Sequence, residues 1–431
     1  MKNKLSKYNV IAHKDGHRLI FNSLKNTYTI LGDDYDLENS DDVRFLEKQG
    51  IVVPEGMDEE KEAFIKYIST CDERCLGITI MPTMACNFRC TYCYENHEGV
   101  SMSDEVVESV IAFVKKRIKE VDRVSVSWFG GEPTLTVDVV EKISQEIIKL
   151  CQFYRKPYSS NMTTNGYYLN AELVKRFLKC RILSYQITLD GNREEHDKIR
   201  FLVNHEGTYD VILNNLIDIR DHVAFPNIGI MLRINVTKET FEEFDKTIDE
   251  LEGLFRDDLR FSFLFRRVGD WGGDTVKTIS DNLIDREDAL TKRLLEYHGS
   301  LRLNSQFTEF GPGYGVCYAG KTNHFVITPT GQVLKCTVRL DEPNNQVGTI
   351  RADGSLLATR NLNTWRYVGG INNYIPDKCK ECAMWANCFN NTCTSATIQK
   401  RVTSTPICNQ LESALLLMYK SYPKMFRHLE C

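Results

Sequence analysis

Three cysteines occur within eight residues of the stretch MACNFRCTYCYEN, at Cys86, Cys90 and Cys93. Thiolates are common protein ligands of zinc and of iron–sulfur clusters, and structural sites of both kinds normally take four protein ligands. Because this stretch holds no fourth cysteine, it predicts a metal centre that keeps one coordination position free. An open position of this kind is what a catalytic metal site needs.

The chain has 15 cysteines, and they are unevenly distributed. Because the total is odd and no export signal is visible at the start, a disulfide framework is not expected. Grouped thiols in a reducing compartment predict metal or cluster ligands. A second group of seven spans 317–408: Cys317, Cys336, Cys379, Cys382, Cys388, Cys393 and Cys408. The remaining five are expected to be ordinary buried thiols: Cys71, Cys75, Cys151, Cys180 and Cys431.

The composition of the 431 residues is that of a soluble globular protein with two or three domains, since 42% are hydrophobic and 26% charged. The net charge of −5 gives no electrostatic reason to expect a nucleic acid or an anionic membrane as a partner. No apolar run approaches the ~18 residues of a membrane span. The expected location is therefore the cytoplasm.

The cysteine trio must be positioned by the region 76–265, in which apolar strand patterns alternate with amphipathic helix patterns. Repeated βα units predict a parallel sheet in an α/β fold, and six units predict a partial (β/α)6 barrel. Chemistry in such folds gathers at the carboxyl ends of the strands. The expected strands are 76–81, 124–129, 159–165, 184–190, 227–235 and 259–265.

Three further blocks flank this region. Residues 1–75 form a front piece, in which 17–31 predicts a hairpin and DDVRFLEKQGIVV a short helix, a glycine stop and a strand. Residues 266–310 are a connector with a helix near 286–299. Residues 311–431 are rich in cysteines and turns and close with an apolar helix, NQLESALLLMYKSY.

A second motif, Gly130-Gly131-Glu132-Pro133, ends the second expected strand about 40 residues after the trio. Together with the spacing CxxxCxφC, in which Tyr92 is the aromatic φ, it resembles the radical SAM superfamily. The resemblance implies that the trio holds three irons of a [4Fe–4S] cluster, whose fourth iron binds S-adenosylmethionine (SAM). One electron would then cleave SAM to a 5′-deoxyadenosyl radical, with Glu132 receiving the methionine amino group. A zinc site with a remote fourth ligand is the alternative for the thiols.

Polar residues at later strand ends also resemble SAM contacts of this superfamily, with Arg200 in the place of the arginine that meets the SAM carboxylate. Turn formation or surface ion pairing would explain the same residues equally well. The cofactor-binding residues implied by the resemblance are Tyr92, Gly130, Gly131, Glu132, Pro133, Thr164, Asn165, Thr188, Asp190, Arg200 and Arg233.

The second cysteine group resembles the SPASM domain, which holds two auxiliary [4Fe–4S] clusters in radical SAM enzymes that modify peptides. The chain departs from the SPASM pattern once, because four residues instead of three separate Cys388 from Cys393. Two zinc ribbons would need about eight ligands. The resemblance implies Cys317, Cys336 and Cys393 for the first cluster, with one position that a substrate thiolate could fill. It implies Cys379, Cys382, Cys388 and Cys408 for the second.

The front piece resembles the small winged-helix-like module with which peptide-maturing relatives bind a leader peptide as an extra strand. The combined resemblance implies a radical SAM/SPASM maturase that cross-links a ribosomal precursor peptide. A thioether is favoured, with C–C or C–O bonds possible, and flavodoxin or ferredoxin would donate the electron. The alternatives are an anaerobic sulfatase-maturing enzyme and a non-enzymatic iron–sulfur or zinc protein.

Overall fold

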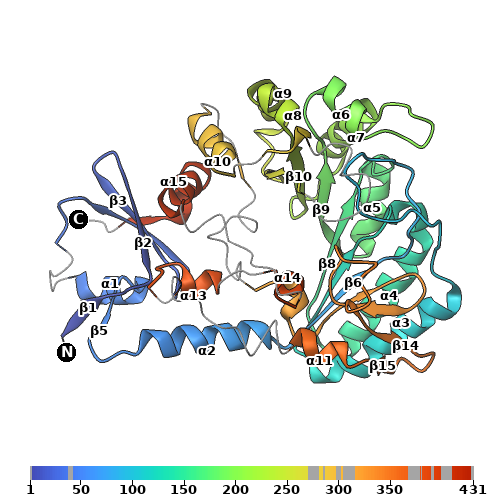
Figure 1. The fold of residues 1–431 in the computed structure, drawn as a ribbon, viewed down its shortest axis with the longest axis horizontal. Helices are drawn as coiled ribbons and strands as arrows, with labels where there is room; N and C mark the ends of the chain where they lie inside the picture. Colours follow the sequence, from blue (N-terminus) through green and yellow to red (C-terminus); the bar gives the residue numbers. More distant parts are fainter. Residues whose placement is uncertain are drawn as a thin grey trace. The chain divides into compact units, whose positions relative to one another are not determined.

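The computed structural model describes residues 2–36, 42–269, 281–284, 287–297, 302–303, 316–366, 379, 381–389, 393–398 and 410–428. The chain divides into two units, and each combines segments that are distant in sequence (Figure 1). The first unit comprises residues 1–73, 286–322 and 366–431, and the second comprises 74–285 and 323–365. The four consecutive domains expected from the sequence stay a prediction.

The second unit contains a sheet with the strand order β11-β10-β9-β8-β7-β6-β12-β13-β14-β15. Each of its first five neighbouring pairs, from β11 to β6, is parallel. The expected α/β fold with a partial, barrel-like parallel sheet is therefore confirmed. The six parallel strands are β6 (Cys75–Ile80), β7 (Arg123–Trp128), β8 (Tyr158–Thr164), β9 (Ile182–Thr188), β10 (Gly229–Val236) and β11 (Phe261–Arg267).

Helices connect these strands, and several begin at side-chain caps. Ser103, Asn170 and Thr237 each accept a hydrogen bond from a backbone N–H of the first helical turn. Such caps satisfy N–H groups that the helix leaves unpaired, so they define where the helices begin. The helices are α3 (Asp104–Arg117), α4 (Val137–Phe153), α5 (Ala171–Lys179), α6 (Arg193–Ile199), α7 (Tyr209–His222), α8 (Lys238–Glu242) and α9 (Phe244–Phe255).

Four later strands extend the same sheet, although the sequence analysis assigns their residues to the cysteine-rich domain. The first of them is parallel to β6, and the other three follow as an antiparallel meander. The meander packs closely on α3, because a Cβ at Gly354 would lie 2.3 Å from the carbonyl carbon of Ala112. The elements are β12 (His324–Ile327), β13 (Gln332–Leu334), β14 (Gln346–Ile350), β15 (Leu356–Ala358) and the following helix α11 (Asn361–Arg366).

The first unit holds an antiparallel sheet of β2 (Asn9–Lys14), β3 (His17–Asn22) and β4 (Thr27–Gly32). The predicted hairpin is confirmed as β3 and β4. The predicted closing helix is confirmed as α15 (Leu411–Ser421), which packs on β2 and β3, and β16 (Arg427–His428) pairs in parallel with β4. The two ends of the chain therefore share one core.

The predicted helix, glycine stop and strand are also confirmed. Helix α1 (Val43–Gln49) ends at Gly50, whose φ of 76° is readily adopted only by glycine. Strand β5 (Val52–Pro54) then pairs with β1 (Asn3–Leu5) in a separate two-stranded sheet. A complete winged-helix module stays a prediction.

The acidic run after β5 forms the start of α2 (Glu59–Cys71), where negative charge is favourable near the helix amino terminus. The predicted connector helix is confirmed as α10 (Glu287–Glu296), and the ammonium of Lys420 donates to the carbonyls of Leu294 and Leu295 at its end. Two short helices, α13 (Trp385–Cys388) and α14 (Thr394–Ile398), complete the unit.

Some predicted features lie outside the described residues, among them Cys408, Cys431 and much of the connector. In the described part of the chain, no helix is both long and apolar enough to cross a membrane.

Candidate functional site

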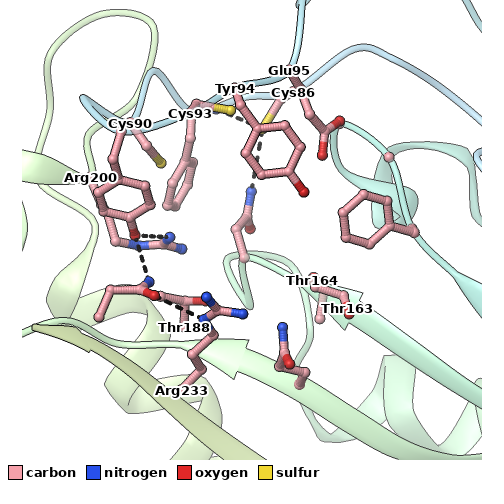
Figure 2. Close-up of a pocket in the computed structure, with 18 of the residues that line it drawn as sticks. Cys86, Cys90, Cys93, Tyr94, Glu95, Thr163, Thr164, Thr188, Arg200 and Arg233 are labelled. Atoms are coloured by element: carbon pink, nitrogen blue, oxygen red, sulfur yellow. Dashed lines mark hydrogen bonds between the residues drawn. The ribbon is translucent and has the colours of Figure 1, made fainter. Parts of the chain in front are cut away.

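A pocket of about 310 Å³ lies at the carboxyl ends of the parallel strands in the second unit (Figure 2). Its lining includes most of the residues that the sequence analysis selects as cluster or SAM ligands. They come from the loop after β6, from the ends of β7, β8, β9 and β10 and, in the case of Arg200, from the end of α6. The selected residues that line it are Cys86, Cys90, Tyr92, Cys93, Gly130, Gly131, Thr164, Asn165, Thr188, Arg200 and Arg233.

The loop after β6, residues 81–103, carries the three cysteines and is closed at its base by backbone hydrogen bonds. Met84 N–H donates to the carbonyl of Val100, and Met102 N–H donates to that of Pro82. We call this segment the cluster loop. Its middle is also tied to the chain after α6, because Thr91 N–H donates to the carbonyl of Ile199. The cysteines are thus positioned by backbone contacts on two sides.

The three thiols face the same pocket from separate positions. Burial raises the pKa of Cys86 and of Cys93 to about 12, and it also raises the pKa of Cys90. Without a metal they are therefore neutral thiols at neutral pH, and metal binding must release their protons. Phe88 N–H donates to Cys86 Sγ at 3.4 Å, which orients this sulfur.

Among the described residues, no three Cys, His, Asp or Glu side chains are arranged to hold a single metal ion. Thiolates around one tetrahedral zinc would bring their sulfurs within about 4 Å of one another, since each Zn–S bond is about 2.3 Å. In an iron–sulfur cluster each thiolate can bind a different iron, so the ligands are farther apart. Three thiols that line one pocket supply the ligands that such a cluster needs, and the zinc alternative stays a hypothesis.

The glycines of the second motif allow the end of β7 to pack against the cluster loop. A Cβ at Gly131 would lie 2.2 Å from the carbonyl oxygen of Ala85. Gly130 has a φ of 101°, and a Cβ there would lie 2.7 Å from the carbonyl oxygen of Thr83. Both glycines are therefore required where the end of β7 comes close to the backbone of the cluster loop.

Glu132 is fully buried and is absent from the pocket lining. Its carboxylate accepts hydrogen bonds from the hydroxyls of Thr134 and Thr164 and from the N–H groups of Thr134 and Asn165. Burial raises the pKa of Glu132, and these hydrogen bonds act in the opposite direction. Glu132 therefore lies behind the residues that line the pocket, where its hydrogen bonds fix the end of β8. Its contact with the SAM amino group stays a prediction. Pro133 is also buried.

The hydroxyl group of Tyr92 makes hydrogen bonds with polar side chains near the carboxyl ends of β9 and β10. It donates to Oδ2 of Asp190 and accepts from Arg200 Nη1 at 3.0 Å and from Asn235 Nδ2 at 3.1 Å. Asp190 itself is fully buried and also accepts from Asn235 N–H at 2.6 Å. Asp190 is therefore positioned to orient Tyr92, while Arg200 lines the pocket directly.

Arg233 and Asn165 are oriented in the same way by neighbouring polar groups. Arg233 Nε donates to Asn235 Oδ1 at 2.9 Å, and Asn165 Nδ2 donates to Asn87 Oδ1 at 2.8 Å. Asn165 Nδ2 also lies 3.9 Å from Cys86 Sγ. The pocket therefore combines thiols with cationic and amide side chains whose orientations are fixed by hydrogen bonds.

Several lining residues were not selected from the sequence: Phe88, Tyr94, Glu95, His97, Phe129, Thr163, Gln186, Arg267, Val268, Gly269 and Val338. Burial raises the pKa of Glu95 to about 7, with a further contribution from Glu132. Burial and the nearby Arg89 lower the pKa of His97. Arg267 ends β11, so its position could be approximated from the βα pattern, but Val338 comes from a distant segment that no local pattern identifies.

The second cysteine group is divided between the two units. Cys336, at the end of β13 in the second unit, is buried, and Asn345 holds its backbone by accepting from Cys336 N–H and donating to the Cys336 carbonyl. In the first unit, Cys382 N–H donates to the carbonyl of Cys379, and Cys388 ends α13. The auxiliary cluster ligand sets, including Cys317, Cys393 and Cys408, stay predictions. Cys71, Cys75, Cys151 and Cys180 are buried as expected.

Comparison with known proteins supports a specific class for the second unit. Residues 80–251 match the model of the Radical SAM superfamily. Among curated proteins, a cysteine-type anaerobic sulfatase-maturating enzyme of Clostridium novyi (strain NT) is 28% identical over 202 residues, which is 43% of this chain and 50% of that enzyme. The chain thus matches only about half the length of this relative. The second unit therefore contains a radical SAM domain.

Two solved structures share the fold. The sulfatase maturase anSMEcpe with bound AdoMet aligns with a TM-score of 0.53 at 17% identity, covering 81% of this chain and 98% of that one. Streptococcus suis SuiB bound to S-adenosylmethionine aligns with a TM-score of 0.50 at 14% identity, covering 92% and 97%. At these identities the likeness shows the fold alone.

The radical SAM domain implies a [4Fe–4S] cluster and SAM, and the residues of the pocket fit both. The cluster loop offers three thiols, and Arg200 offers a cation on the same wall. Nε of Arg200 is buried without a hydrogen-bond partner in the described part of the chain. An unpaired buried donor is unfavourable, and a bound carboxylate would satisfy it.

Proposed function

We propose that this chain is a radical SAM enzyme that cross-links a ribosomally made precursor peptide, with a thioether as the favoured bond. The observation that supports the proposal most is the pocket of the radical SAM domain. It combines three thiols on one loop with cations and polar strand ends that suit SAM. The proposed cofactors are one SAM-binding and two auxiliary [4Fe–4S] clusters.

When bound, SAM and a reduced cluster supply a 5′-deoxyadenosyl radical that removes a hydrogen atom from the substrate. Cys86, Cys90 and Cys93 would hold the cluster. Arg200 is suited to the SAM carboxylate because charge-assisted hydrogen bonds to carboxylates are strong. Thr188, Asn165 and Arg233 would orient the remainder of SAM. A flavodoxin or ferredoxin would provide the electron.

Leader-peptide binding is proposed for the sheet of the first unit. Among the described residues, β2 is an edge strand of the order β16-β4-β3-β2, and edge strands can accept an additional strand through their backbone groups. Hydrogen exchange measured with and without precursor tests this proposal. Residues 9–14 should become protected when the leader is present, whereas a precursor without its leader should leave their exchange unchanged.

The thioether proposal rests on the second cysteine group. Three thiolates, from Cys317, Cys336 and Cys393, would leave one iron of the first auxiliary cluster open to a substrate thiolate. Carbon–sulfur bond formation would remove one hydrogen atom to 5′-deoxyadenosine and one thiol proton, and an auxiliary cluster held by these cysteines would supply an acceptor for the remaining electron. The product is then lighter by two hydrogens. A Cys→Ser change at the acceptor of the precursor should abolish the cross-link but not 5′-deoxyadenosine formation.

The deciding experiment measures 5′-deoxyadenosine after the reconstituted protein is reduced and given SAM under anaerobic conditions. We expect steady formation and about twelve irons per chain for three clusters. Absence of 5′-deoxyadenosine from iron-loaded protein would contradict the enzymatic proposal and favour a non-enzymatic iron–sulfur protein. Zinc without iron would contradict the cluster assignment.

An anaerobic sulfatase-maturing enzyme is an equally plausible second candidate, because a relative with that name is 28% identical over 202 residues. Such an enzyme oxidises a cysteine or serine of a sulfatase to formylglycine. A synthetic sulfatase-site peptide separates the two proposals, since formylglycine contains an aldehyde that hydrazide reagents capture. Capture with this peptide, and no cross-link in a precursor, would favour the second candidate.

A further inference from the structure

The pocket extends past the predicted SAM contacts toward the segment that carries Cys336. Tyr94, Glu95 and His97 line this part together with Val338. Asn96 Nδ2 donates to both carboxylate oxygens of Asp341 at 3.1 Å, so this part of the cluster loop lies beside the chain that follows Cys336. A substrate that enters the pocket next to SAM would meet these side chains.

Glu95 contributes the only acidic side chain in the described lining of the pocket. Its Oε2 is buried and has no hydrogen-bond partner among the described residues, and the same holds for Nδ1 of His97. Figure 2 shows the carboxyl group of Glu95 directed into the pocket, on the side opposite Arg233. Burying a carboxylate without a partner is unfavourable, which indicates that a ligand completes this site.

We propose that Glu95, together with His97, binds a cationic side chain of the substrate, either a lysine ammonium or an arginine guanidinium, beside the residue that reacts. This inference rests on the proposed function, because it requires that a peptide enter the pocket of the SAM-loaded enzyme. It adds a substrate preference that the cysteine motifs do not specify.

The unpaired polar atoms of Glu95 and His97 favour binding of a cationic group over binding of a neutral hydrogen-bond donor. Charge-assisted hydrogen bonds are roughly twice as strong as neutral ones, and an ammonium or guanidinium group has several donors for two adjacent sites. The arginines that line the described part of the pocket already serve other groups. Arg200 donates to Tyr92, Arg233 donates to Asn235, and Arg267 donates to the carbonyl of Ile284. Bound cluster thiolates and the SAM carboxylate would also offset their positive charge.

Calorimetry on the SAM-loaded, cluster-reconstituted full chain tests the proposal with small probes. The cationic probes are N-acetyl-lysine and N-acetyl-arginine N-methylamides, and the neutral controls are the matching norleucine and citrulline compounds. We expect at least one cationic probe to bind ten-fold or more tightly than its neutral control. The stronger of the two identifies the side chain. Equal binding within each pair, or no binding, would overturn the proposal without any variant.

A nearly isosteric variant tests the residue itself. Glu95→Gln should abolish the preference for the cationic probe while the dissociation constant of SAM and the iron content stay within two-fold of wild type. Glu98→Gln removes the same charge from an exposed position three residues away and should keep the preference. If Glu95→Gln instead weakens SAM ten-fold and keeps the probe preference, the carboxylate serves SAM and the proposal fails. Failure of the proposed function is a separate result, because then wild type forms no 5′-deoxyadenosine.

Discussion

The two groups of cysteines have different surroundings. Those of the cluster loop lie outside helices and strands and line a pocket among polar groups. In the first unit, Cys379 packs with Tyr8 and Trp385, and Cys388 belongs to the apolar core that α15 forms with the sheet. Cys382 packs against both of these clusters.

If metals bind at both places, as proposed, this contrast predicts different uses for them. A metal in the pocket remains accessible to a small molecule, as an exchangeable coordination position requires. A metal held among apolar side chains is shielded from solvent, and burial of this kind tunes a reduction potential rather than admitting a substrate. Changes in the two regions should therefore have effects of different size on SAM cleavage.

The largest effect should follow from removing the thiols of the pocket. The triple variant Cys86→Ala/Cys90→Ala/Cys93→Ala should lose about four irons per chain and all detectable 5′-deoxyadenosine formation, because one cluster has no ligands. Iron analysis and chromatography measure the two quantities. Cys151→Ala, at a buried cysteine between α4 and the sheet, is the control and should keep both. Cleavage by the triple variant would exclude these thiols as the SAM site.

A backbone change should have the next largest effect. Gly131→Ala places a methyl group 2.2 Å from the Ala85 carbonyl oxygen and must displace the cluster loop. We expect SAM cleavage to fall about 100-fold, since displacements near 1 Å in an active site have effects of this size. Gly229→Ala in β10 is the matched control, because its Cβ would meet only Ser184 Oγ at 3.9 Å. Equal activity of the two variants would show that the loop adapts.

Loss of the Tyr92 hydroxyl should have a moderate effect. Tyr92→Phe removes hydrogen bonds to Asp190, Arg200 and Asn235, and we expect SAM to bind about ten-fold more weakly, which is about 1.4 kcal/mol. A double-mutant cycle with Asp190→Asn measures how strongly the two residues act together. Additive losses would mean that Asp190 does not act through Tyr92.

The smallest effect on SAM cleavage should come from the other cysteine group. Cys388→Ala should lower the iron content by up to four per chain and destabilise the first unit, since the side chain lies in its core. The rate of 5′-deoxyadenosine formation without peptide should stay within about three-fold of wild type, because none of the described residues of that core lines the pocket. Loss of cleavage comparable to that of the triple variant would remove the contrast between the two regions.

The sequence predicted the parallel strands well, because they alternate with amphipathic helices, several of which begin at recognisable caps. It also predicted most of the pocket, because the carboxyl ends of parallel strands meet at one edge of the sheet. Thr164, Thr188 and Arg233 could be selected from their positions at strand ends, without any tertiary information.

The features that were missed depend on contacts between distant segments. Strands β12 to β15 are short and carry few residues of strong strand pattern, and only pairing with β6 joins them to the sheet. The packing of Gly131 against Ala85 and the burial of Glu132 behind the pocket lining also depend on residues that are distant in the sequence. The pairing of β5 with β1 follows from tertiary packing too, since short strands can pair with several partners.

The closed base of the cluster loop has a consequence for recovery from oxygen damage. Hydrogen bonds between Met84 and Val100 and between Met102 and Pro82 join the two ends of the loop through its own backbone. We expect a loop that is closed by its own backbone to keep this base if a bound cluster is lost, which would leave a template for repair. Iron and sulfide supplied later can then rebuild the centre within an already folded chain, without synthesis of a new one.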